Sequence, residues 1–92
     1  MSVKVHLSGH LKAYSGNELE VDLPGEYATV GDVLRSLWDR HAALRDRVLN
    51  EQGEIRQHVN VFVGSTDVKC REGLSTRVET NDIHIFNAVS GG

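Results

Sequence analysis

Hydrophobic and polar residues alternate in two short segments near the N-terminus, residues 3–7 and 19–23. An alternation with a period of two is typical of a strand that buries one of its faces. The turn-rich residues 9–17 separate the two segments, and Pro24-Gly25 follows the second one. The sequence therefore predicts an antiparallel hairpin whose second strand has an acidic outer face.

A helical spacing of apolar residues replaces this alternation after Thr29. The apolar positions that follow are Val30, Val33, Leu34, Leu37 and Trp38. They form one stripe along a helix that we expect over residues 29–40, and this stripe must pack on another element. Thr29 is a suitable N-cap, and Asp32 three residues later gives a variant of the capping box. A second short helical turn is expected near residues 42–49.

The second half of the chain predicts further strands. Residues 59–63 alternate valine with other residues and place Phe62 on the second face, and apolar residues on both faces indicate a central strand. Residues 64–67 are expected to turn the chain, and residues 68–70 to form a short partner strand. Residues 83–86 are expected to begin the last strand.

The predicted order is strand, strand, helix, strand, short strand, strand. One helix across a mixed sheet of about five strands is a two-layer α+β domain, and the order matches the β-grasp, or ubiquitin-like, fold. In that fold the first and last strands lie side by side and parallel at the centre of the sheet. We therefore expect a β-grasp domain over residues 1–86 and a flexible tail over residues 87–92. The predicted core consists of Val5, Leu7, Val21, Val30, Val33, Leu34, Leu37, Trp38, Val59, Val61 and Ile85.

The length fits a single domain, and the composition argues against nucleic acid as a partner. The 92 residues are enough for one modest core, and the net charge of −3 argues against a nucleic-acid-binding protein. The only cysteine, Cys70, has no intrachain partner, so we expect a reducing compartment. The sequence has no apolar signal segment and no stretch long enough to span a membrane. A cytoplasmic protein that binds neither nucleic acid nor membrane is expected.

The candidate chemistry lies in the last residues. The sequence ends in Gly91-Gly92, which places its α-carboxylate on the least hindered residue. Because glycine has no Cβ, such an arm can enter a narrow channel in a partner. Once ATP has adenylated the carboxylate, a sulfur donor gives a thiocarboxylate and an amine gives an amide. A terminal Gly-Gly is also typical of a frayed terminus, but the β-grasp order favours the functional interpretation.

Three segments together resemble one known family of small proteins. They are the strand over residues 59–63, the turn and strand over residues 80–86, and the tail over residues 88–92. With the opening strand and the helix after Thr29, they make nearly the whole chain similar to the ThiS/MoaD family of sulfur carriers. Within it, the chain looks most like the carriers of cysteine biosynthesis and of siderophore thioacid formation. Asn87 stands where this family often has a proline.

The resemblance implies a carrier and not an enzyme. Gly92 would be adenylated by an E1-like enzyme and converted to a thiocarboxylate, while Gly91, Ser90 and Val89 would thread into the partner. The implied partners also include sulfide or a sulfur donor protein, a sulfur-accepting biosynthetic enzyme, and a metalloprotease that exposes Gly-Gly. No Gly-rich phosphate loop is present, so we expect ATP to bind the activating partner and no cofactor to bind this chain.

The sequence leaves two alternatives open. The same glycine would serve a ubiquitin-like modifier that is joined to lysines, and a plain β-grasp interaction module would need no chemistry at its end. The sulfur acceptor is open as well. It could be a serine-derived intermediate on the way to cysteine, a siderophore precursor, a pterin or a thiazole.

Other candidate sites lie within the domain. A tail alone offers too few contacts for selectivity, so Phe62 is the candidate for partner docking, with packing inside the domain as the alternative. The five histidines have no metal-ligand spacing, and no metal site is expected. We expect His6 and His84 to form a surface pair on neighbouring strands. Cys70 is interpreted as a structural or incidental thiol.

Overall fold

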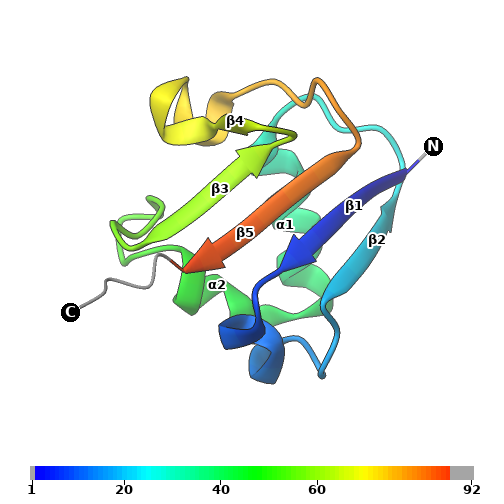
Figure 1. Ribbon diagram of the computed structural model, residues 1–92, viewed down its shortest axis with the longest axis vertical. Coiled ribbons are helices and arrows are strands. Elements are labelled where there is room, and N and C mark those ends of the chain that lie inside the picture. The colour runs from blue at the N-terminus through cyan, green and yellow to red at the C-terminus, as the bar shows by residue number, and fades with distance from the viewer. Residues whose placement is uncertain (1, 88–92) are drawn as a thin grey trace.

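The structure is a computed structural model that describes residues 2–87, and it contains one mixed sheet with helices packed against it (Figure 1). The helices and strands are β1 (Ser2–Leu7), β2 (Glu20–Pro24), α1 (Val30–Arg40), α2 (Ala42–Val48), β3 (Val59–Val63), β4 (Thr66–Asp67) and β5 (Asp82–Asn87). Short 3-10 helices cover Gly9–Tyr14 (η1), Val68–Cys70 (η2) and Gly73–Ser75 (η3). Within residues 2–87, no helix has both the length and the apolar character needed to cross a membrane.

The strands lie in the order β2-β1-β5-β3-β4. The first and last strands are parallel neighbours, with Val5 opposite Ile83, and every other pair is antiparallel. A parallel pair needs a crossover connection, and α1 belongs to the segment that supplies it. The predicted β-grasp fold is confirmed, and β5 lies inside the sheet with a partner strand on each side.

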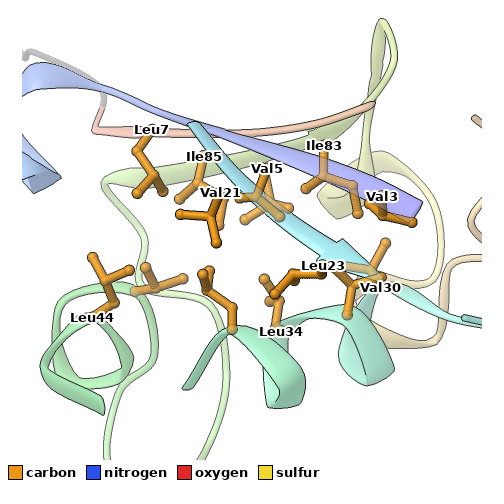
Figure 2. Packing of buried hydrophobic residues seen from close by; sticks show 14 of the residues in the cluster. Val3, Val5, Leu7, Val21, Leu23, Val30, Leu34, Leu44, Ile83 and Ile85 are labelled. Carbon is orange, nitrogen blue, oxygen red and sulfur yellow. The ribbon is translucent and has the colours of Figure 1, made fainter. Parts of the chain in front are cut away.

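One face of the sheet packs on α1, and Figure 2 shows the aliphatic side chains of the two layers meeting there. Every predicted core residue is buried except Trp38, which is half-buried at the margin of the core. The core also contains residues that the prediction omitted: Val3, Leu11, Leu23, Leu44, Val48, Leu49, Val63, Val68 and Ile83. Because α1 alone is too narrow to cover the sheet, α2 and η1 contribute to the same core.

The start of α1 has the predicted capping box. The backbone N–H of Asp32 donates to Thr29 Oγ1 at 3.3 Å, and the backbone N–H of Thr29 donates to Asp32 Oδ2 at 3.2 Å. The Arg35 guanidinium also donates to the Asp32 carboxylate. The hydroxyl and backbone N–H of Thr29, followed by Arg35, hold the pKa of Asp32 below its ordinary value of 3.8. The helix therefore begins where local hydrogen bonding in the sequence predicts it.

The segment after β3 differs from its prediction. Residues 68–70 form η2 and not a strand, because Asp67 Oδ1 accepts a hydrogen bond from the backbone N–H of Lys69 at 2.9 Å and caps a helical turn. The short strand is instead Thr66–Asp67, which the sequence analysis placed in the turn. This strand pairs only with Phe62 and Val63, so β3 has a neighbour on both sides only at its C-terminal end.

Three further boundaries differ from the prediction. Leu19 is 46% exposed, because β2 begins only at Glu20, although the Leu19 carbonyl already accepts a hydrogen bond from the backbone N–H of Leu7 at 2.8 Å. The turn-rich residues 9–17 contain η1, which buries Leu11 in the core. The last strand continues through Asn87, which pairs with Val59 and which the sequence analysis assigned to the tail.

Candidate functional site

The tail predicted to carry the chemistry, Val89-Ser90-Gly91-Gly92, lies outside the described residues. The structure does place the residue from which this tail departs. Asn87 ends β5 and is held opposite Val59 in the antiparallel ladder with β3. Five residues follow Asn87, and a segment of that length spans at most about 17 Å when fully extended. A partner that acts on Gly92 must therefore bind close to this end of the sheet.

The sheet face opposite α1, called here the open face, is covered by no element among residues 2–87, and it faces the viewer in Figure 1. Strand alternation and register place on it Lys4, His6, Glu20, Asp22, Asn60, Phe62, Asp67, Asp82, His84 and Phe86. The strand register aligns Glu20, His6, His84 and Phe62 in one row across β2, β1, β5 and β3. The face next to the root of the tail thus carries aromatic, imidazole and carboxylate groups side by side.

Two phenylalanines form an aromatic pair on the open face. The ring centroids of Phe62 and Phe86 are 5.4 Å apart with the planes tilted by 36°, which is a favourable geometry for aromatic contact. Both side chains are half-buried. Phe62 therefore packs against a neighbouring strand and leaves part of its ring exposed to solvent, and its role in docking stays a prediction.

Two histidines extend this aromatic surface across the parallel strands. The rings of His6 and His84 are stacked, with centroids 4.4 Å apart and planes 11° from parallel. His6 Nε2 lies 3.1 Å from Asp82 Oδ1, and His6 Nδ1 lies 3.5 Å from Glu20 Oε1. The predicted surface pair is confirmed, and its carboxylate neighbours come from β2 and β5.

Phe86 is an open-face residue that the sequence pattern did not single out. The pattern over residues 83–86 predicts a strand, but it does not say which residue of another strand lies beside Phe86. The pairing of Asn60 with Phe86 and of Phe62 with His84 brings the two phenylalanines together diagonally. The alternation in the two predicted strands does place Phe62 and Phe86 on the same face of a sheet, and this was the signal in the sequence that could have identified Phe86.

The remaining candidates stand apart from this face. Cys70 is exposed at the end of η2. Within the part of the chain that the structure describes, no three His, Cys, Asp or Glu side chains are grouped so that they could hold a metal ion.

No protein-family model matches the chain. Small archaeal modifier protein 3 of Haloferax volcanii is 41% identical over 66 residues, which cover 71% of each protein. The sulfur carrier protein CysO of Mycobacterium tuberculosis is 28% identical, and the match covers the full length of both chains.

The structural comparison gives the same relatives. The crystal structure of an Amycolatopsis orientalis BexX/CysO complex contains a chain that matches with a TM-score of 0.85 and 30% identity. The match covers 98% of this chain and 99% of that one. The similarity therefore extends over the whole fold, including the sheet from which the tail departs.

Proposed function

This chain belongs to the family of ubiquitin-like sulfur carriers and small archaeal modifier proteins, and we propose that it carries sulfur as a thiocarboxylate on Gly92. The observation that supports this most directly is the position of the Gly-Gly terminus, five residues beyond a central strand of a β-grasp sheet. The chain acts as a protein cosubstrate, and partner enzymes supply the catalysis.

The proposed chemistry takes place in two steps on the terminal carboxylate. In an E1-like enzyme, a carboxylate oxygen of Gly92 attacks the α-phosphorus of ATP, which gives an acyl adenylate and releases pyrophosphate. Hydrosulfide, added as such or delivered by a sulfur donor protein, then attacks the acyl carbon and AMP leaves with its phosphate oxygen. The product is a thiocarboxylate whose sulfur is nucleophilic. The absence of a side chain on Gly91 and Gly92 lets both steps proceed without steric hindrance.

Docking of the activating enzyme is proposed to use the open face together with the tail. Val89, Ser90 and Gly91 would occupy the channel that leads to the enzyme's active site. Because the tail reaches at most about 17 Å from Asn87, an enzyme holding Gly92 lies beside the same end of the sheet. Phe62 and Phe86 offer it a half-buried aromatic surface, the kind of contact that dominates many interfaces.

The sulfur-accepting partner is proposed to be a biosynthetic enzyme. Several relatives are named CysO, and the CysO of Amycolatopsis orientalis was crystallised in a complex with BexX. This relationship favours delivery to a precursor of cysteine or to a comparable biosynthetic acceptor, such as the precursor of a siderophore thioacid. A metalloprotease is proposed only for the case in which the gene extends beyond Gly92.

The proposal is tested by intact mass after incubation with an E1-like enzyme, ATP and sulfide. Exchange of one oxygen for sulfur raises the mass by about 16 Da, and oxidation of Cys70 to a sulfenic acid gives nearly the same shift. The Cys70→Ser variant separates the two, because it retains the thiocarboxylate and loses the oxidation. The proposal predicts that Cys70→Ser gains the mass on its C-terminal fragment and that deletion of Gly92 abolishes the gain. A gain of about 16 Da that survives the deletion and requires Cys70 would be oxidation of the thiol, and a Cys70→Ser chain that gains no mass on its C-terminal fragment would refute the proposal.

A second candidate function is conjugation to lysines, and the similarity to small archaeal modifier proteins favours it. Both functions share the acyl adenylate and differ in the nucleophile that attacks it. Incubation with the activating enzyme, ATP and cell extract, with and without sulfide, distinguishes them. A modifier gives new covalent adducts that end in an isopeptide at Gly92, whereas a dedicated carrier gives the thiocarboxylate alone.

A further inference from the structure

The open face is divided into two halves of different chemistry. Over β3 and β5 lies the Phe62–Phe86 pair, with the uncharged Asn60 beside it. Asp67 of β4 lies opposite Phe62 at the edge of the sheet, where its carboxylate caps η2. Over β2, β1 and the start of β5 lie the carboxylates of Glu20, Asp22 and Asp82. The stacked rings of His6 and His84 form the boundary between the aromatic half and the acidic half.

The acidic half has more negative charge than its own cations neutralise. Lys4 lies between Asp22 and Asp82 in the strand register, and its Nζ is 3.7 Å from Glu20 Oε2. Among the strand residues that the structure describes, this ammonium is the only permanent cation on the open face, and the acidic half carries three carboxylates against it. The side chains of Glu20 and Asp82 remain 58% and 57% exposed, so their charges are directed to solvent and available to a partner.

His6 does not cancel this charge in its neutral form. Both of its ring nitrogens face carboxylate oxygens, Nε2 toward Asp82 and Nδ1 toward Glu20. A neutral imidazole donates through one nitrogen only, and a carboxylate can only accept. One of the two carboxylates is therefore left without a hydrogen bond from His6, and a cationic group from outside can take that place.

The two halves have a fixed spacing, because they belong to one sheet. Glu20 on β2 and Phe62 on β3 are in the same row and are three strands apart. With neighbouring strands about 4.8 Å apart, this separation is about 14 Å. A protein that covers the row must therefore present an apolar pocket and a cationic group at about this distance from each other.

From this arrangement we propose that the open face binds a protein surface on which arginine or lysine side chains flank an apolar pocket. The aromatic half fills the pocket, and the acidic half attracts the cations, increases the rate of encounter and fixes the orientation in which the tail enters. The inference rests on the proposed function, because it assigns this surface to the activating enzyme. A second copy of this chain fits less well, because two acidic halves in one interface repel each other.

The test measures the kcat/KM of adenylation, from ATP-dependent pyrophosphate release by the E1-like enzyme, at low and at high KCl. The test variant is Glu20→Gln combined with Asp82→Asn. The matched control is Asp39→Asn combined with Glu51→Gln, which removes the same charge from two exposed positions off the open face. At low salt we expect the test variant to lose about tenfold in kcat/KM through a higher KM, with kcat unchanged. The wild type and the control should lose activity as KCl rises, and the test variant should lose much less.

Each result bears on one proposal. An unchanged or increased kcat/KM in the test variant, or a salt dependence equal to that of the control, would overturn the cationic partner and leave the carrier function intact. Failure of the enzyme to adenylate even the wild type would instead refute the proposed function and the inference with it. Sedimentation of the chain alone distinguishes self-association: a dimer that Phe62→Ser dissociates would assign the open face to a second copy.

Discussion

The five strands of this protein supply two faces, one buried against α1 and one that no described element covers. The buried face is almost entirely aliphatic, and fully buried positions such as Val5, Val61 and Ile83 could be exchanged for similar residues without a change of chemistry. The open face combines phenylalanines, stacked histidines and carboxylates, and these groups have specific partners. Residues on the buried face thus hold the fold together, and residues on the open face carry the groups that we propose a partner contacts.

The largest expected effect on the free energy of unfolding comes from truncating a residue that packs on the buried face. Leu34→Ala removes a side chain that is 1% exposed, and we expect it to lower the free energy of unfolding by about 2–5 kcal/mol, because it leaves a cavity between α1 and the sheet. Denaturant unfolding followed by circular dichroism measures the loss. Leu19→Ala is the matched control, since Leu19 is 46% exposed and its truncation should cost well under 1 kcal/mol. Equal losses at the two positions would contradict the assignment of the core.

On the open face, the effect should appear in binding more than in stability. Phe62→Ser should lower the kcat/KM of adenylation by about tenfold or more, whereas its effect on the free energy of unfolding should be about 1 kcal/mol. Steady-state pyrophosphate release and denaturant unfolding give the two numbers. Tyr27→Ser is the control, because Tyr27 is a partly buried aromatic residue away from the open face. If Phe62→Ser lost activity only in proportion to its loss of stability, Phe62 would be a packing residue.

A smaller effect is expected where the two histidines meet. His84→Ala removes the ring stacked on His6 but leaves the buried face unchanged, so we expect a loss below about 1 kcal/mol. Thermal unfolding of the variant and of the wild type measures it. A loss as large as that of Leu34→Ala would show that the open face contributes to the stability of the fold as much as the core does.

The smallest expected effect on stability comes from Asp32, which lies at the start of α1 and on neither face of the sheet, and this effect should depend on pH. The pKa of Asp32 is lower in the folded chain than the ordinary value of 3.8, so its ionised carboxylate stabilises the fold fully above that value. This stabilisation is lost as the pH falls from 3.8 through the lower folded pKa. The unfolding free energies of wild type and Asp32→Asn should therefore differ at neutral pH and converge in acid. Asp39→Asn, at an exposed position on the same helix, should give no such convergence.

Much of the fold could be predicted because local chemistry decides it. The capping box at Thr29 and the alternation in β1 and β3 involve residues a few positions apart, and their hydrogen bonds and periods are readable in the sequence. The prediction failed at η2, where the Asp67 carboxylate caps a helical turn in a segment whose composition also suits a strand. It also failed at Leu19, because alternation does not mark the residue at which a strand begins.

For the candidate site, too, the sequence determined one part and the tertiary structure decided the other. The sequence by itself determined the Gly91-Gly92 terminus as the candidate reactive end and Phe62 as a candidate docking residue. Only the tertiary structure decided which residues share the open face, because parallel pairing of the first and last strands brings His6 and Asp82 together across 76 positions of sequence. A period of two assigns a residue to a face of its strand. This alternation does not say which strand is the neighbour or in what register the two strands pair. Long-range packing of the whole sheet on its helices fixes both.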